Sequence, residues 1–268
     1  MKETGANQII IILLLMPCLA GFVESGYNKS TKKDELIFIS TEQEKIMGAN
    51  VARQVDKRFK EVDDPLVQKR IEDIGGKIGN ACERKDVIYR FKVLKSEEKD
   101  NYNAFSLPGG YVYIFDTLLG KLKSDDDIAA ILAHEVAHVA AKHSIKQLQT
   151  AMGVNALMIL GIGMQTDGRT FATAGEALTQ LMMSYSREAE VDADALSVKY
   201  LKDAGYNPDS VLNALLMLRE LRKKSPIRTY MYYRSHPYLS ERIARVKSEI
   251  KGSMDFESYI NIPKDESF

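Results

Sequence analysis

The sequence has no excess of either charge. Its 268 residues include 37 basic and 37 acidic side chains, and no run of like charge is long enough to form a polybasic arm. Nucleic-acid binding depends on cationic side chains that contact phosphates, so this balance argues against a nucleic-acid partner. The chain also has no internal repeat and no low-complexity linker, and its length suits one compact domain with a sizeable core.

Cysteine and long hydrophobic runs are scarce as well. Residues 9–16 are an unbroken apolar run, and the small residue Ala20 follows shortly after. This pattern is typical of a secretory signal peptide at residues 1–20, and the run is too short for a comfortable transmembrane helix. An uncleaved anchor and an imperfect lipobox at Cys18 are the alternatives. Cleavage after Ala20 would leave Cys82 as the single cysteine, which excludes an intramolecular disulfide.

Helical periodicity dominates the rest of the chain, which predicts a mostly helical α+β fold. Residues 21–40 read as a loose N-terminal segment, 41–252 as the folded domain and 253–268 as a tail. Within the domain, strands are expected at 89–94 and within 103–115, and the later helices at 125–149, 171–203, 208–224 and 238–251. The apolar segment 152–164 is too short to span a bilayer and is expected to be a buried helix, with a mobile, membrane-facing or site-covering segment as the alternative.

Residues 134–138 read His-Glu-Val-Ala-His inside one predicted helix. A helix advances about 100° per residue, so His134 and His138 lie on one face and can hold one Zn²⁺. Glu135 lies beside them, where it could take a proton from a water molecule in the metalloprotease arrangement. The alternative is two ordinary histidines on a buried helix, which is disfavoured because burying them without a partner is costly.

A catalytic zinc site needs a third protein ligand. Only four histidines exist, and His143 lies nine residues after His134. On one continuous helix this spacing places His143 on the opposite side, so it is expected to be a surface histidine outside the metal site.

A carboxylate from another helix is therefore the better candidate for the third ligand. Residues 186–194 contain two pairs at helical spacing, Glu188 with Asp192 and Glu190 with Asp194, on faces about 160° apart. The face of Glu190 looks more buried, which weakly favours Glu190 as ligand and Asp194 as the hydrogen-bond acceptor behind a metal-bound histidine.

Four motifs in order resemble a known family. They are Asn-Ala-Phe-Ser-Leu-Pro-Gly-Gly at 103–110, the 134–138 motif, Ser-Arg-x-x-Glu-x-x-Ala-Asp at 186–194, and Ser-His-Pro at 235–237 followed by Arg242. The sequence is similar to the HtpX-like and CAAX prenyl endopeptidase family of gluzincin zinc metallopeptidases, in its exported single-domain branch, over roughly residues 41–250. The resemblance implies a zincin-like fold with one Zn²⁺ per chain and Glu190, not Glu188, as the third ligand.

The same resemblance implies how a substrate would be held. It makes segment 103–114 the sheet edge that lines the substrate cleft, with contacts from Asn103, Ala104, Phe105, Tyr111, Val112 and Tyr113. An extended substrate could pair with the backbone near residues 111–114. His236 is implied to reach the site, either to contact substrate and transition state or to cap the zinc in a resting form. The alternative for His236 is a structural histidine beside Pro237, and nearby tyrosines could line subsites or pack on the core.

These patterns predict an exported zinc endopeptidase that cleaves misfolded or unassembled proteins of the periplasm or cell envelope. Its partners would be unfolded or extended polypeptides, and association with a membrane surface stays open. The alternative is a zinc-containing, chaperone-like binding module with a closed or weakly active site. The presence of Glu135 favours the enzyme, because a pure binding protein has no need of a general base.

Overall fold

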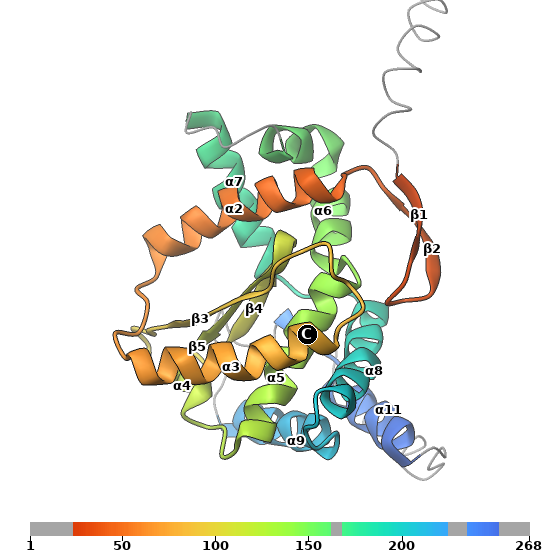
Figure 1. Cartoon of the computed structure of the whole chain (residues 1–268). Helices are drawn as coiled ribbons and strands as arrows, with labels where there is room; N and C mark the ends of the chain where they lie inside the picture. The colour runs from red at the N-terminus through yellow and green to blue at the C-terminus, as the bar shows by residue number, and fades with distance from the viewer. Residues whose placement is uncertain (1–23, 162–167, 225–234, 252–268) are drawn as a thin grey trace, which may run out of the picture.

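The computed structural model describes residues 24–161, 168–224 and 235–251, so the expected signal peptide and C-terminal tail lie outside the described residues. Helices surround a small sheet in the described part, which confirms the expected α+β, mostly helical class (Figure 1). In chain order the elements are β1 (Glu24–Asn28), β2 (Lys33–Ile37), α2 (Thr41–Arg58), α3 (Pro65–Ala81), β3 (Arg90–Leu94), β4 (Ala104–Leu107), η1 (Pro108–Gly110), β5 (Tyr111–Phe115), α4 (Asp116–Leu119), α5 (Asp125–Ala140), α6 (His143–Gly161), α7 (Gly168–Leu181), α8 (Arg187–Asp203), α9 (Asp209–Lys224) and α11 (Leu239–Lys251).

Three strands form the sheet beside the site, in the order β3-β5-β4. The central strand β5 runs parallel to β3 and antiparallel to β4. The connection from β4 to β5 is the 3₁₀ turn η1, where Gly109 and Gly110 have φ of 76° and 98°, a region strained for any residue with a Cβ. Because β5 is paired on both sides, the prediction that a substrate strand pairs with residues 111–114 is wrong. The free edge of this sheet near the site is β4.

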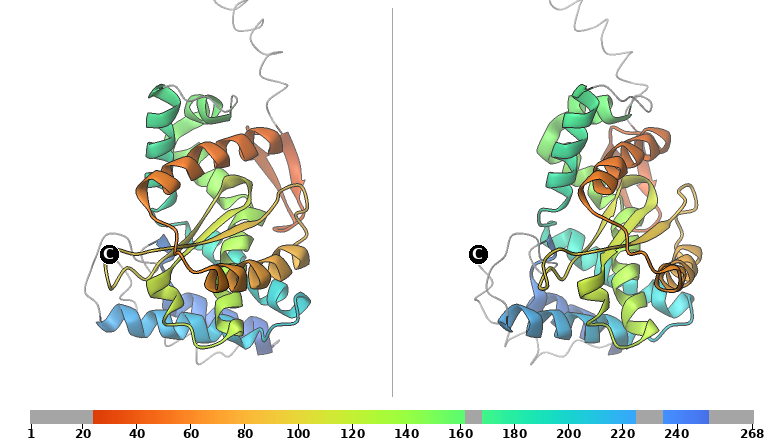
Figure 2. Two further views of the ribbon diagram at one scale, coloured as in Figure 1. Left: turned by 60° about the vertical axis from the view of Figure 1, so that its left-hand side comes forward. Right: turned by 90° about the vertical axis from the view of Figure 1, so that its left-hand side faces the viewer.

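The alternation of side chains along β5 divides the core into two clusters. Val112 and Ile114 pack in the cluster that includes α3 and α5. Tyr113 and Phe115 point the other way, into the cluster built with α2, α6 and α7. Figure 2 shows the sheet between these two groups of helices. A sheet covered on both faces is rigid, which suits it to support a site on the adjacent helix α5.

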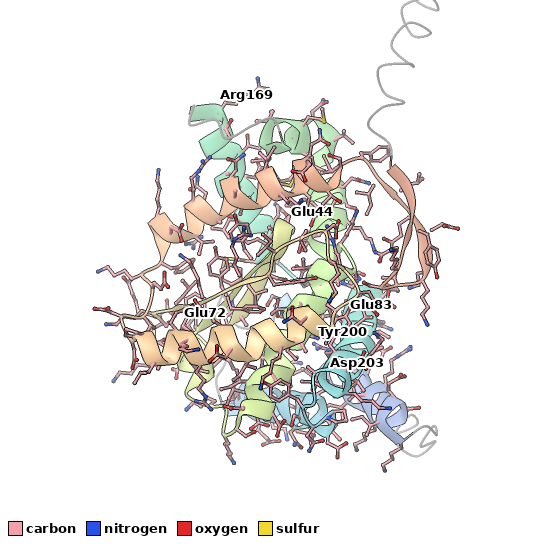
Figure 3. The ribbon with its side chains drawn as sticks, in the orientation of Figure 1. Glu44, Glu72, Glu83, Arg169, Tyr200 and Asp203 are labelled. Atoms are coloured by element: carbon pink, nitrogen blue, oxygen red, sulfur yellow. The ribbon has the colours of Figure 1, made fainter. Side chains whose placement is uncertain are left out.

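A buried ion pair ties α2 to this sheet and to α5. Glu44 on α2, labelled in Figure 3, lies 2.7 Å from Arg84 and accepts a hydrogen bond of 3.1 Å from the Gly109 amide. Arg84 also donates to the carbonyl of Val139 in the last turn of α5, at 2.7 Å. Burial alone would lower the pKa of Arg84, but the facing Glu44 carboxylate more than reverses this and raises it. Gly48 lets α2 approach closely, since a Cβ there would lie 2.0 Å from the Pro108 carbonyl oxygen.

The N-terminal segment differs from the loose lead-in expected for residues 21–40. Strands β1 and β2 pair as an antiparallel hairpin. The side chain of Asn28 closes the turn by accepting from the Ser30 amide at 3.0 Å. Lys146 of α6 anchors the hairpin through an ion pair of 2.6 Å with Glu35. Polar turn contacts and an ion pair hold this hairpin. Because these contacts need no alternation of apolar residues, the sequence of the segment predicts a loop rather than two strands.

Two helices expected to be continuous are each broken in two. The helix expected at 125–149 ends at Ala140, and a break at Lys142, whose φ is 55°, separates it from α6. The helix expected at 171–203 is interrupted between α7 and α8. Neither break carries a proline or glycine signal in the sequence, because tertiary packing rather than local propensity ends these helices.

The described part of the apolar segment 152–164 belongs to α6. Leu157 and Leu160 are fully buried, and Asn50 of α2 donates to the Leu160 carbonyl at 2.7 Å. Through residue 161 the segment packs one side against α2, while Gly153 breaks the helix and Asn155 is exposed, so the expectation of a buried helix holds only for part of it; residues 162–164 lie outside the described part. No described helix is both long and apolar enough to cross a bilayer.

Candidate metal centre

Helix α5 presents the first two histidines of the site. Ser124 caps the helix by accepting from the Asp127 amide at 3.1 Å, and three aspartates in the first turn suit the helix dipole. Residues 128–140 are all buried, so the helix runs through the core. The Nε2 atoms of His134 and His138 lie 3.1 Å apart on one face, as four-residue spacing requires.

Helix α8 supplies a carboxylate to the same point. Glu190 is fully buried, and its two oxygens lie 3.5 Å from His134 Nε2 and 3.5 Å from His138 Nε2. Glu188 of the competing pair is exposed. The expectation that the Glu190 face is the buried one is therefore confirmed, because α8 packs that face against α5.

His236 comes from a segment far away in sequence and completes the cluster. Its Nδ1 lies 3.3 Å from His134 Nε2 and 2.9 Å from the Glu190 carboxylate. Four candidate ligand atoms, one each from His134, His138, Glu190 and His236, lie within 4.8 Å of one another. A tetrahedral Zn²⁺ site with bonds of about 2.0–2.2 Å would separate its ligand atoms by about 3.3–3.6 Å, so this donor set fits zinc.

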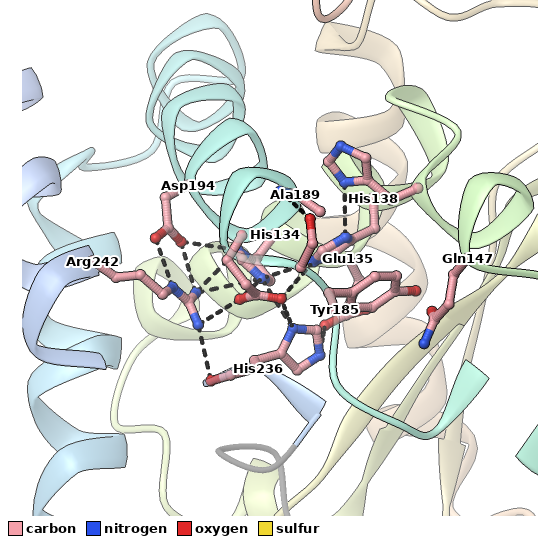
Figure 4. A network of polar contacts seen from close by, with 12 residues as sticks. His134, Glu135, His138, Gln147, Tyr185, Ala189, Asp194, His236 and Arg242 are labelled. Carbon is pink, nitrogen blue, oxygen red and sulfur yellow. Dashed lines mark hydrogen bonds and ion pairs between the residues drawn. The ribbon is translucent and has the colours of Figure 1, made fainter. Parts of the chain in front are cut away.

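The carboxylate of Glu135 is buried beside the donor cluster. Both carboxylate oxygens are buried and have no hydrogen-bond partner among the described residues. The imidazole of His236 lies beside it, with Nε2 3.4 Å from Glu135 Oε1. An unsatisfied buried carboxylate is costly and is retained where it serves chemistry. Figure 4 shows Glu135 among the site residues that the preceding contacts bring together.

A second layer holds the ligands from behind (Figure 4). Asp194 lies 3.0 Å from His134 Nδ1 and accepts from Arg242 at 2.7 and 2.8 Å. Arg242 also reaches Glu190 at 2.6 Å and donates to the His236 carbonyl. One buried guanidinium therefore connects both carboxylates with the loop that carries His236. Sequence reasoning matched Arg242 to the family but assigned it no role.

Burial and the charges of this layer shift the pKa values of the candidate ligands in different directions. Burial alone would raise the pKa values of Glu190 and Asp194, but the Arg242 charge reverses this and both pKa values are lowered. Burial lowers the pKa of His138 to about 4, so its imidazole is neutral at neutral pH. For His134, burial and Arg242 oppose protonation, but hydrogen bonds to Asp194 and Glu190 outweigh them and raise its pKa to about 9. A metal would displace that proton on binding.

The expectation that His143 is a surface histidine is wrong. It is buried, with 4% exposure, and its Nδ1 lies 3.0 Å from His138 Nδ1. The prediction assumed that α5 continues, but the break at Lys142 changes the direction of the His143 side chain, which faces His138. Sequence reasoning also missed Tyr185, whose ring stacks on His138 with centroids 4.0 Å apart. No local pattern marks either residue.

The six residues expected to contact substrate lie in or beside the sheet. All except Tyr111 are buried: Asn103, Ala104, Phe105, Val112 and Tyr113. Phe105 and Tyr113 stack on each other at 5.0 Å within the α2 side of the core. Their side chains are packed rather than displayed, so a role in substrate contact stays a prediction.

Comparison with known proteins is consistent with this geometry. The description "Peptidase family M48" matches residues 65–250, more than half of the chain. The chain belongs to peptidase family M48. This confirms the expected HtpX-like relationship and makes the protein a zinc metallopeptidase.

Individual relatives are distant. The chain is 24% identical to the beta-barrel assembly-enhancing protease of Escherichia coli over 78% of its own length and 44% of that protein. It is 26% identical to the metalloprotease LoiP of the same organism, over 68% of this chain and 70% of LoiP. It is 27% identical to the mitochondrial metalloendopeptidase OMA1 of Schizosaccharomyces pombe, over 54% of this chain and 42% of OMA1. The chain thus spans less than half the length of the first of these relatives.

Proposed function

We propose that this metallopeptidase is an endopeptidase whose Zn²⁺ is held by His134, His138 and Glu190. The observation that carries the proposal is the buried donor cluster with Glu135 beside it. Zinc bound there would polarise the peptide carbonyl and lower the pKa of water to about 7. Glu135 would accept the proton of the attacking water and pass it to the leaving amine. General acid–base catalysis of this kind contributes about 10²- to 10⁴-fold.

His236 has two roles in this proposal. Its Nδ1 stands at the fourth corner of the donor cluster, and catalytic zinc sites keep that corner open for water or substrate. We therefore propose that the cluster is a resting form, which His236 leaves during turnover. Its imidazole would then be close enough to donate a hydrogen bond to the developing oxyanion.

The substrate would be an extended polypeptide of the cell envelope. The relatives named as a beta-barrel assembly-enhancing protease and as metalloproteases support this class. The signal-like residues 1–20 support export. Strand β4 offers the free edge of the sheet and packs against α5, so an extended substrate would pair with β4. Association with the membrane surface is part of the same proposal.

The decisive experiment compares the purified wild-type protein with Glu135→Gln on an unfolded protein substrate. The variant should lose at least about 100-fold in cleavage rate while it keeps its zinc and its melting temperature. Glu188→Gln, on the exposed face of α8, is the matched control and should cleave normally. Undiminished cleavage by Glu135→Gln would refute the catalytic role of Glu135, and absence of cleavage by the zinc-loaded wild-type protein would favour a binding module. Mass spectrometry of the N-terminus after expression tests export, because an unprocessed residue 1 contradicts cleavage near Ala20.

A further inference from the structure

The two histidines of α5 have different partners on the side that faces away from the donor cluster. His134 Nδ1 faces the carboxylate of Asp194 at 3.0 Å. His138 Nδ1 faces another imidazole, the Nδ1 of His143, also at 3.0 Å. Both imidazoles of this second pair are buried, with exposures of 0% and 4%. Among the described residues, the acidic contact of His138 is with Glu190 and lies on the Nε2 side of the ring, not on the Nδ1 side.

The chemistry of a metal-bound imidazole decides which ring donates. His138 Nε2 points into the cluster, so a cation bound there leaves the ring proton on Nδ1. That N–H must then donate to His143, and His143 Nδ1 must accept it. His143 is consequently neutral and carries its own proton on Nε2. A metal-bound histidine normally donates its second N–H to a partner that fixes its orientation.

We infer that His143 is a positioning residue that fixes the tautomer and ring orientation of His138 for zinc binding. The inference rests on the proposed function, since it takes His138 as a ligand. The ring of His138 is held in two ways, by the hydrogen bond to His143 and by the stacked ring of Tyr185 at 4.0 Å and 18°. The Tyr185 hydroxyl in turn lies 3.1 Å from Ser144 Oγ, so the start of α6 supplies the first restraint and contacts the second.

Because His143 is a neutral hydrogen-bond acceptor, it adds no charge to the buried site. Three carboxylates, Glu135, Glu190 and Asp194, and one guanidinium, Arg242, already surround the cluster. Together with a dication they sum to zero. A fourth carboxylate behind His138 would leave the buried site with a net negative charge, which His143 avoids while it still accepts the proton of the ligand.

A matched pair of variants tests the inference. In His143→Asn the amide Oδ1 stands where His143 Nδ1 stands, so an acceptor remains, whereas His143→Leu has similar bulk and no acceptor. Zinc affinity is measured by competition with a chromogenic chelator on the full chain. We expect about 10- to 100-fold weaker binding for His143→Leu and binding close to wild type for His143→Asn. Equal loss in both variants, or loss in neither, would overturn the inference.

A second measurement stays informative if His143→Leu does not fold. Nitrogen-15 spectra of histidine-labelled, zinc-loaded wild type should show His138 protonated on Nδ1 and His143 protonated only on Nε2. A proton on His143 Nδ1 would overturn the inference. Failure of the underlying proposal is distinguished by His138→Ala: if that variant retains zinc, the ligand set is wrong, whereas its loss of zinc together with unchanged affinity in His143→Leu refutes the positioning role alone.

Discussion

The buried pair of Glu44 and Arg84 offers the sharpest test of how the site is supported. Their side chains are 2% and 7% exposed, and the carboxylate receives two hydrogen bonds from the guanidinium, at 3.0 and 2.7 Å. Glu44→Ala would leave the Arg84 charge in the core with Val139 and the half-exposed Asp86 as its remaining contacts.

The expected loss in the free energy of unfolding depends on these remaining contacts of Arg84. Removing one partner of a buried pair costs about 3–5 kcal/mol, and the remaining contact of Arg84 with Asp86 favours the lower end, about 3 kcal/mol. For a domain of this size, 1 kcal/mol corresponds to about 2–4 °C, so the melting temperature should fall by about 6–12 °C. Arg84→Met should cost a similar amount, because it strands the Glu44 carboxylate.

Urea denaturation and calorimetry of the purified chain measure both variants and the double variant. The double variant should be less destabilised than the sum of the two, by about 2 kcal/mol, since no buried charge is stranded. Glu42→Ala, on the same helix with a side chain 77% exposed, is the control and should stay within about 0.5 kcal/mol of wild type. A loss below 1 kcal/mol for Glu44→Ala, with additive single variants, would refute the reasoning.

The remaining predictions concern the metal and the approach of α2. Glu190→Ala should strip zinc from the purified protein as measured by elemental analysis, whereas Glu188→Ala should not; equal retention contradicts the ligand assignment. Asp194→Asn should weaken zinc binding by about 10- to 100-fold in a chelator competition, and unchanged affinity would argue against its role behind His134. Chelation of zinc should lower the melting temperature reversibly, because a ligand of the native state stabilises it, and an unchanged melting curve would contradict a bound metal. Gly48→Ala should destabilise by about 1–3 kcal/mol through its clash with Pro108, whereas Gly76→Ala, with open space around its position on α3, should be neutral or stabilising in the same denaturation assay.

Local patterns predicted much of the fold. Helix α5 begins at Asp125 as expected, because the Ser124 cap and the acidic first turn that start it are interactions between neighbours in sequence. The strands β3 and β5 also lie where alternation placed them. Strand order could not be read in the same way. Which edges of β5 are paired depends on long-range contacts with β3 and β4, so the substrate-pairing expectation failed there.

The residues of the site also fall into those that local sequence patterns predict and those that only long-range contacts place. Spacing within α8 offered two pairs, and the more apolar face weakly favoured Glu190 and Asp194, both of which are buried in the structure. The roles of His143 and Arg242 had no such signal. Lys142 interrupts the helix with a positive φ that nothing in the sequence marks, and Arg242 contacts Asp194, which lies 48 residues away in sequence.

The sequence by itself determined the pair His134 and His138 with Glu135 between them, since helical geometry over five residues needs no tertiary information. Only the tertiary structure decided what surrounds that pair. It packed α8 against α5 to bring in Glu190, carried His236 to the fourth corner, and turned α6 so that His143 faces His138. These placements depend on the packing of elements distant in sequence, which bury charges only where other charges and hydrogen bonds can balance them.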